Sequence, residues 1–355
     1  MNSTAAHSEK PNVETIPRPF CPVCTSEGSF IYHNLKDRLF NNPGEWNMKK
    51  CNNAACRMFW LDPTPKEEDI PKLYENYSTH DDAPFVPINT HTPLRRLFER
   101  VRQRYLHTHY GYEADSHSFT DTALGLLAYL HPAWKDSQAA NIFYLPNHPR
   151  GTLLDVGCGN GTSMQKMKSM GWNVVGTDFD EKAVKNAQSK GLEVYHGDIS
   201  SQHFMPETFD AIMMNHVIEH VPHPIALLKE CRELLKNDGH LSIITPNAAS
   251  RGSAHFGRNW RALETPHHLQ VFTVQSLALL AKEAGFSEIK SFSSLQGAQY
   301  ILGASANLKQ GKPSDKPEAY TLFNRIKKQA VWFVLGWIHV LLPGRDEVAV
   351  IVCRK

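Results

Sequence analysis

The sequence predicts an α/β fold in which a parallel sheet carries helices on both faces. From residue 151 onward, short apolar runs alternate with helical stretches, which is the pattern of such a sheet. Seven runs are expected to be strands: TLLDVG, NVVGTD, LEVYHGD, FDAIMMN, HLSIITPN, and residues 287–293 and 347–353. Four cysteines near the N-terminus also predict a small separate module.

Changes in composition divide the chain of 355 residues into five segments. They are a flexible arm (1–18), a zinc-ribbon module (19–62), a helical connector or substrate cap (63–150), the main α/β domain (151–294 with 345–355) and a helical insert (295–344).

The overall composition is that of a globular protein and excludes several classes. Apolar residues make up 41% and the formal net charge is only +2, whereas proteins that hold nucleic acid by bulk charge are usually more basic. No apolar run reaches the ~18–20 residues that span a bilayer, and no apolar signal segment precedes the arm. We therefore expect a cytoplasmic protein.

The spacing of Cys21, Cys24, Cys51 and Cys56 predicts a structural zinc site. The pairs C-P-V-C and C-N-N-A-A-C are separated by 26 residues, so two tight turns can bring four thiolates together as a tetrahedron. Two disulfides or four free thiols are the alternatives, and a reducing cytosol disfavours disulfides. Four thiolates leave no open coordination position, so such a site stabilises the fold.

A glycine-rich turn follows the first strand of the main domain. The strand ends in Asp155, and Gly157, Gly159 and Gly161 follow at every second position. Glycine allows positive φ and a close approach of a ligand to the main chain, and the next helix directs its N-terminal amides into the same crevice. Because Thr162 occupies the sixth position of the glycine pattern, the spacing argues against binding of a dinucleotide pyrophosphate.

Two acids follow the next two strands and suggest a nucleoside site. Asp178 ends the second strand, where a carboxylate can accept hydrogen bonds from both ribose hydroxyls, and Asp198 follows the third, where it can face an adenine amino group. Each acid could instead cap a helix. The glycine turn, Asp178 and Asp198 follow three successive strands, and together they favour the nucleoside site. Asn215, which ends the fourth strand, is assigned to the same site.

These residues resemble the class I S-adenosylmethionine-dependent methyltransferases. The resemblance covers about residues 151–293 and rests on DVGCGNG, GTDFD, YHGDI, FDAIMMNHVIEHV and TPHHLQVFTVQSLALLAKEAGF. It implies a Rossmann-like, seven-stranded methyltransferase sheet and S-adenosyl-L-methionine as the cofactor. It also implies that Asp155 and the glycine turn hold the methionine part, Asp178 the ribose and Asp198 the adenine.

Candidate catalytic residues follow the fourth strand in NHVIEH. In a helical turn His216, Glu219 and His220 share one face, where they could bind a divalent metal. His267 or His268 could then supply a fourth ligand. The set looks like the Glu-x-x-Glu-His metal site of ubiquinone-pathway and small-RNA 2′-O-methyltransferases, except that His216 replaces the first Glu. The alternatives are a metal-free histidine base, or hydrogen bonds that only hold the loop.

A deprotonated hydroxyl is the expected nucleophile, and three functions compete. The first is O-methylation of a sugar, nucleotide-sugar or surface-glycan intermediate, because the CPVC module resembles bacterial enzymes that methylate such compounds. The second is an RNA methyltransferase with a zinc-ribbon reader, which the near-neutral charge disfavours. The third is a non-catalytic module of a polysaccharide assembly complex that keeps the cofactor fold. The sequence does not predict an oligomeric state.

Residues 330–342 form the longest apolar run, interrupted by Gly336 and His339. As a helix it would be apolar nearly all round, which favours burial within the chain or against a partner subunit. The alternative is a helix lying on the inner membrane surface with Trp332 and Trp337 at headgroup level. Trp260, near the candidate catalytic residues, could stack on a sugar or pack beneath a loop.

Overall fold

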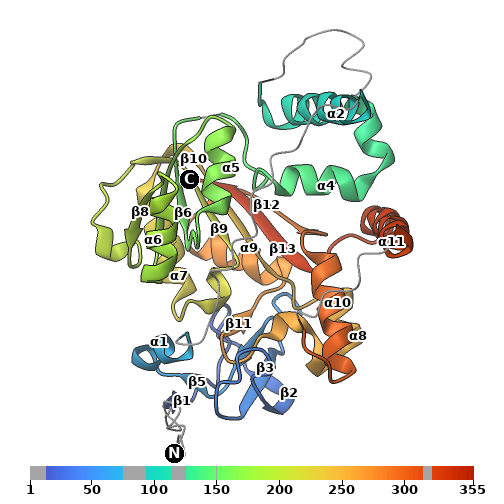
Figure 1. Cartoon of the computed structure of the whole chain (residues 1–355). Helices are drawn as coiled ribbons and strands as arrows, with labels where there is room; N and C mark the ends of the chain where they lie inside the picture. The colour runs from blue at the N-terminus through green and yellow to red at the C-terminus, as the bar shows by residue number, and fades with distance from the viewer. Residues whose placement is uncertain (1–12, 75–92, 114–124, 149, 315–321) are drawn as a thin grey trace, which may run out of the picture.

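The computed structural model describes residues 13–74, 93–113, 125–148, 150–314 and 322–355. Most of the predicted arm, and the connector between residues 75 and 92, therefore lie outside the described residues. The described part has a large central sheet with helices on both faces and a smaller N-terminal sheet (Figure 1).

The central sheet has seven strands, as the sequence predicts, in the order β12-β13-β10-β9-β6-β7-β8. Strand β13 is antiparallel to both of its neighbours, whereas the pairs among β10, β9, β6, β7 and β8 are parallel, so the sheet is mixed rather than wholly parallel. The bounds are β6 (Thr152–Val156), β7 (Asn173–Asp178), β8 (Glu193–His196), β9 (Phe209–Asn215), β10 (Leu235–Pro246), β12 (Ser287–Ser294) and β13 (Val348–Arg354).

Alternate residues of each strand pack into opposite core layers, because side chains along a strand point to opposite faces. Leu153 of β6 packs in the layer that contains Met164, whereas Leu154 packs in the layer that contains Leu228. The first layer includes residues of α4 (Pro132–Ala140), α5 (Thr162–Ser169) and α6 (Glu181–Ser189), and the second includes residues of α7 (Pro224–Leu234) and α9 (Val274–Glu283).

The N-terminal sheet is built from two distant parts of the chain. Its order is β11-β4-β3-β2, and β11 comes from the loop that follows the candidate residues His267 and His268. This sheet lies below the carboxyl ends of the parallel strands, where ligands bind in open α/β sheets (Figure 1). The bounds are β2 (Gly28–Leu35), β3 (Trp46–Cys51), β4 (Phe59–Leu61) and β11 (Gln270–Val271); β1 (Thr15–Ile16) and β5 (Thr64–Pro65) form a separate pair.

The other helices flank these two sheets. They are α1 (Ile70–Leu73), α2 (Pro93–Tyr110), α8 (Arg251–Phe256), α10 (Ala298–Lys309) and α11 (Leu322–Leu341). Short 3₁₀ turns are η1 (Glu67–Asp69), η2 (Leu126–Leu130), η3 (Ser200–Gln202), η4 (Ile218–His220), η5 (Gly257–Asn259) and η6 (Arg261–Leu263).

Helix α11 contains the long apolar run and is buried on one face only. A Cβ added to Gly336 would lie 2.6 Å from the backbone nitrogen of Ala133, so glycine permits the close crossing of α11 over α4. On the outer face, Val334 is 55% exposed and Leu341 is 72% exposed. The outer face is therefore not covered by the described part of this chain, and its burial against a partner subunit stays a prediction. Among the described residues, no helix combines the length and apolar character needed to cross a membrane.

Candidate active site and cysteine centre

The glycine turn after β6 takes the backbone conformation that its sequence predicts. Gly157, Gly159 and Gly161 have φ values of 70°, 54° and 78°. A Cβ on Gly157 would lie 2.5 Å from Val217, and one on Gly161 would lie 2.4 Å from Leu192. A Cβ on Gly159 would meet nothing within 4 Å. The outer two glycines are thus required by packing, whereas Gly159 borders open space that a ligand can use.

The acids after β7 and β8 both make local backbone contacts. Asp178 accepts hydrogen bonds from the amides of Gly159 (2.7 Å) and Asp180 (2.9 Å), so it braces the glycine turn. Asp198 is exposed and accepts a hydrogen bond from the amide of Ser201 in η3 at 2.9 Å. Their contacts to ribose and adenine remain predictions.

Two neighbouring strands each present a buried oxygen that has no hydrogen-bond partner among the described residues. These are Oδ2 of Asp155 in β6 and Oδ1 of Asn215 at the end of β9, which pairs with β6. Burial, together with the nearby charge of Asp178, raises the pKa of Asp155 well above its ordinary value. A buried carboxylate without a partner is unfavourable, so this position suits a cationic ligand.

Glu219 lies at the centre of a buried acid–histidine cluster in the loop after β9. Its side chain is fully buried. One carboxylate oxygen lies 3.2 Å from Nδ1 of His216, and the other accepts a hydrogen bond from the Thr245 hydroxyl at 2.9 Å. Burial raises the pKa of Glu219, but the hydrogen bond and charge of His216 outweigh it and lower the pKa to about 2. Glu219 is therefore a carboxylate at neutral pH.

His268 directs an unprotonated nitrogen toward two carboxylates. Its Nδ1 donates to the carbonyl oxygen of Ala262 at 2.8 Å, which leaves Nε2 with a lone pair in the neutral ring. That Nε2 lies 3.9 Å from Glu219 and 3.6 Å from Glu264. Burial lowers the pKa of His268 to about 4, so the ring is neutral at pH 7. A bound cation would be favourable between these groups.

The two remaining candidate histidines are held differently. Nδ1 of His220 lies 2.8 Å from the hydroxyl of Tyr74 and 3.0 Å from the carbonyl oxygen of His267. The side chain of His267 points away from this group, and its Nε2 contacts the Leu73 carbonyl oxygen at 3.0 Å and the Asn42 amide at 3.3 Å. His267 therefore fastens the loop to the N-terminal part of the chain.

The residues with metal-ligand geometry differ from the first set that the sequence suggests. The ligand atoms of Glu219, His220 and His268 all lie within 4.8 Å of one another. His268 therefore takes the place expected for His216, which contacts only Glu219 in this cluster. His216 adopts φ 57°, so residues 216–220 do not form one continuous helical face.

Two residues of this cluster were not among the sequence candidates. Glu264 precedes His268 by four residues, and this spacing could have identified it. Tyr74 comes from the connector near α1, and the sequence has no motif that brings it to His220. Glu264 reaches the site from the same loop as His268, whereas Tyr74 reaches it from the end of α1.

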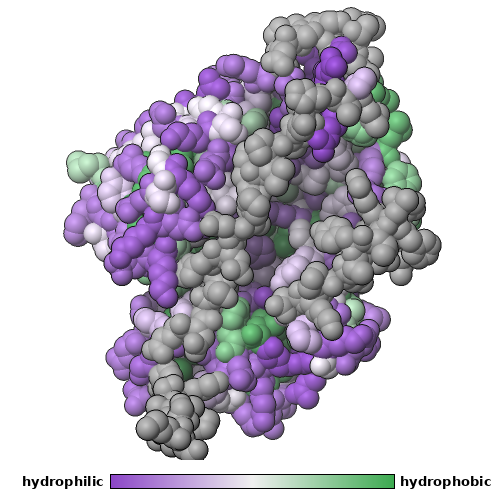
Figure 2. Space-filling model, in the orientation of Figure 1, coloured by the Kyte–Doolittle hydropathy of each residue, from purple (hydrophilic) through white to green (hydrophobic). Residues whose placement is uncertain are grey.

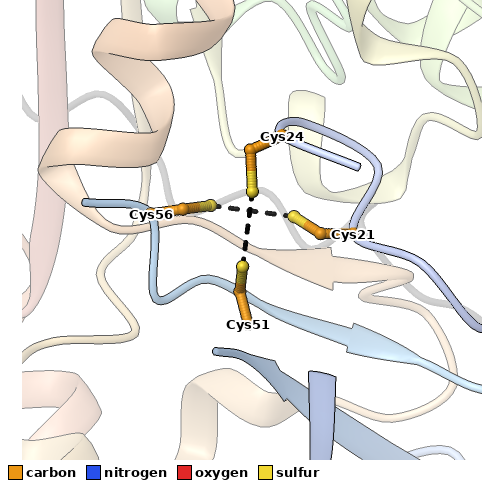
Figure 3. Close-up of side chains that lie close together, drawn as sticks. All are labelled: Cys21, Cys24, Cys51 and Cys56. Carbon is orange, nitrogen blue, oxygen red and sulfur yellow. Dashed lines mark hydrogen bonds between the residues drawn. The ribbon is translucent and has the colours of Figure 1, made fainter. Parts of the chain in front are cut away.

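The four N-terminal cysteines converge as their spacing predicts (Figure 3). Sγ of Cys21 lies 3.7 Å from that of Cys56, and Sγ of Cys24 lies 3.4 Å from that of Cys51. All four are free thiols, and their sulfur atoms lie within 4.8 Å of one another. The hydrogen bond between Cys21 and Cys56 lowers the pKa of Cys21 and raises that of Cys56, so Cys21 is the thiolate of this pair. The donor set suits zinc.

Comparisons with known proteins agree with this arrangement. Residues 128–291 match a family model described as a methyltransferase domain. The ubiquinone biosynthesis O-methyltransferase of Glaesserella parasuis is 34% identical over 110 residues, which are 28% of this chain and 47% of that protein. Its counterpart in Dinoroseobacter shibae is 29% identical over 157 residues, 41% of this chain and 63% of that protein. The chain thus spans about half the length of the first of these relatives.

Similar solved structures include a SAM-dependent methyltransferase from Archaeoglobus fulgidus, with 20% identity, a TM-score of 0.40, and coverage of 58% of this chain and 87% of that chain. Another is a possible histamine N-methyltransferase from Thermotoga maritima, with 20% identity, a TM-score of 0.42, and coverage of 66% and 95%. Residues 128–291 thus match a methyltransferase domain, and the glycine turn within them is the one that the resemblance to class I S-adenosylmethionine-dependent methyltransferases predicts.

Proposed function

We propose that the protein is an S-adenosylmethionine-dependent O-methyltransferase that acts on a hydroxyl of a sugar, nucleotide-sugar or glycan intermediate. The observation that carries this proposal is the cluster of Glu219 and His220, from the loop that directly follows Asn215, with His268 from the loop before β11. Asn215 ends the strand beside the glycine turn. An acid–base group and a cofactor crevice thus share one edge of the sheet.

The cofactor crevice fits a cationic nucleoside. Oδ2 of Asp155 lacks a partner among the described residues, and positive charge on the methionine part would favour the ionised form of this side chain. Gly159 leaves room for close approach, and Asp178 holds the turn in place. When bound, S-adenosylmethionine supplies an electrophilic methyl group on its sulfonium. The protein must then align the acceptor hydroxyl and remove its proton.

His220 is the proposed base. Its Nδ1 faces Tyr74 and the His267 carbonyl oxygen, which fixes the ring and leaves Nε2 to take the hydroxyl proton. Glu219 and Glu264 are carboxylates at neutral pH, because the pKa of each is lowered to about 2. Their charges would stabilise His220 once it is protonated.

The same cluster fits a divalent cation, because the lone pair of His268 and the carboxylate of Glu219 point into a common space. A cation held by Glu219, His220 and His268 would lower the pKa of a hydroxyl that it binds. Zinc is proposed for the cysteine centre, where four thiolates complete the coordination and stabilise the N-terminal sheet.

The acceptor class can be tested by its product. Purified protein is incubated with a cell extract and S-adenosylmethionine that carries an isotopically labelled methyl group, and fractions are analysed by mass spectrometry. We expect the label in sugar- or glycan-containing compounds. Label in RNA alone, in a reaction that requires Glu219, would replace the proposed acceptor with a nucleic acid.

Gly159→Ala is expected to weaken binding of S-adenosylhomocysteine by at least about tenfold, because the added methyl group would enter the cofactor crevice. Gly191→Ala is a matched control: Gly191 has φ 73°, and a Cβ there also meets nothing within 4 Å. Both variants should lose a similar amount of thermal stability, and only Gly159→Ala should change the affinity measured by titration calorimetry. Equal affinities would place the cofactor elsewhere.

The outer face of α11 is proposed to contact an anionic membrane surface from the cytoplasmic side, which would suit a lipid-carried glycan acceptor. Exposed apolar side chains continue from α11 to η2, where Leu126 and Leu130 are 65% and 63% exposed, and the ring of Phe333 contacts His131 beside η2. Apolar surface is visible near α2 and α4 in Figure 2. The exposed arginines Arg95 and Arg96 of α2 would favour acidic lipid.

Wild-type protein is therefore expected to pellet with vesicles that contain phosphatidylglycerol, and the double change Val334→Glu and Trp337→Glu should abolish pelleting. Leu279→Glu is the control, because Leu279 is an exposed leucine on α9, away from this face. Absence of pelleting at low salt would contradict the membrane contact. A dimer that the double change dissociates would show instead that a second copy covers the face.

A further inference from the structure

A cavity of about 300 Å³ lies where the N-terminal sheet meets the loop before the histidine pair. Its walls carry four basic side chains, namely Lys36 and Arg38 from the segment after β2, and Arg258 and Arg261 from the later loop. Glu264 is the acidic side chain in its lining. Lys36 pairs with Glu45 at 3.2 Å and Arg261 pairs with Glu264, so the positive charge of the cavity comes from Arg38 and Arg258.

The segment that carries Lys36 and Arg38, at the outer edge (rim) of the cavity, is fixed by hydrogen bonds to its backbone. The buried Asp37 accepts hydrogen bonds from the amides of Leu39, Phe40 and Asn42, which fixes the segment that carries Lys36 and Arg38. This segment also contacts the histidine loop, because Asn42 reaches His267 at 3.3 Å. The cavity wall is thus a built part of the fold that is tied to the active-site loop.

Two rim arginines bond to neutral oxygens, which leaves their charge available to a ligand. Arg38 donates to the side-chain oxygen of Asn259 at 2.6 Å and to the Leu308 carbonyl oxygen. Arg258 donates to the His33 carbonyl oxygen at 2.7 Å. By contrast, Arg251 pairs with Asp346, and Arg354 pairs with Asp238 and Glu288. Guanidinium groups of this kind recognise phosphate and carboxylate oxygens.

The inner end of the cavity leads to the proposed catalytic cluster. Arg261 forms an ion pair with Glu264, and its buried Nε has no hydrogen-bond partner among the described residues. Glu264 lies 3.6 Å from Nε2 of His268. Trp260 also lines this end, but it is 2% exposed and its indole donates to Glu347 at 2.8 Å, so it packs beneath the loop.

We propose that this cavity binds an oxyanion of the acceptor, a phosphate or carboxylate group, with Arg38 and Arg258 as the recognition residues. The inference rests on the proposed function, because it names the acceptor chemistry of the same site. Binding of the anion at the rim would leave the rest of the acceptor to extend past Arg261 toward Glu264 and His268. The cavity therefore selects acceptors that carry a negative charge.

The probes are pyrophosphate and malonate, titrated into the full chain by calorimetry at constant ionic strength. Wild-type protein should bind at least one of them, and Arg258→Gln should weaken that binding by about tenfold, the loss expected for one charge-assisted contact. Arg232→Gln is the matched control, because Arg232 also donates to a single backbone carbonyl oxygen, that of Gly285, at 2.9 Å. This control should bind the probe as wild type does.

Stronger binding of pyrophosphate would indicate a phosphorylated acceptor, and stronger binding of malonate a carboxylated one. No binding of either probe, or equal affinities of wild type and Arg258→Gln, would overturn the inference. S-adenosylhomocysteine is titrated into the same samples. If S-adenosylhomocysteine binds and the anions do not, the proposed anion site is wrong but the proposed cofactor site is supported. If S-adenosylhomocysteine does not bind to the wild-type protein, the proposed function itself is contradicted.

Discussion

Glu219→Gln is expected to lower the turnover of methyl transfer by at least about a hundredfold and to leave the affinity for S-adenosylhomocysteine unchanged within about twofold. The change keeps the size of the side chain and its hydrogen bond with Thr245, but it removes the negative charge that faces His216 and His268. That charge supports a protonated histidine or a bound cation, and acid–base catalysis typically contributes 10²–10⁴-fold.

Asp136→Asn is the control for loss of a buried carboxylate. Asp136 accepts hydrogen bonds from Tyr144 and Ser294 far from the catalytic loop, so its variant should lose stability and keep its turnover number. Turnover is measured with labelled cofactor, and bound metal by elemental analysis of both variants. Wild-type turnover in Glu219→Gln would remove this cluster from the catalytic mechanism.

Cys51→Ser is expected to remove zinc from the protein and to lower its melting temperature by more than about 10 °C. Structural zinc sites contribute about 10–16 kcal/mol to the folding of small modules, and each kcal/mol corresponds to several degrees. Here the effect extends beyond the N-terminal sheet. The carbonyl oxygen of Cys56 accepts a hydrogen bond from Thr273 at 2.6 Å, and β11 completes the sheet from the same loop. We therefore also expect activity to fall.

Elemental analysis should find one zinc per wild-type chain and none in Cys51→Ser. Cys231→Ala is the control, because Cys231 is a fully buried core residue outside the cysteine centre. It should lose stability through a small cavity and keep its zinc. A metal-free wild-type protein with an unchanged melting temperature would show that the four thiols alone support the fold.

Features that depend on local sequence could be predicted well. The glycine turn, the end of β7 at Asp178 and the convergence of the four cysteines all follow from spacing and periodicity, and β6 ends one residue after Asp155. The turn and the strand ends are determined by residues that are close together in the sequence, and the cysteine centre is determined by the need of one metal ion for four ligands. Contacts with distant parts of the chain therefore do little to change them. The reversed direction of β13 depends instead on the long insert before it, which a strand pattern does not determine.

The composition of the acid–histidine cluster could be predicted only in part. The sequence identified Glu219, His220 and His268, but it grouped the first two with His216 because it assumed a helical turn. The positive φ of His216 breaks that turn. The hydroxyl of Tyr74 contacts Nδ1 of His220 through a long-range contact, and the sequence around Tyr74 contains no motif that predicts it. Burial of α11 could also be predicted only in part, because hydropathy does not show which face of an apolar helix packs against the rest of the chain.

Strand β11 has a consequence for how the chain can be divided. A fragment that begins at residue 128 would contain β11 but lack β4, its partner in the N-terminal sheet. Its backbone would then have an open edge next to the histidine loop, and such edges promote self-association. A fragment that is meant to keep its activity is therefore expected to need the cysteine-bearing strands as well.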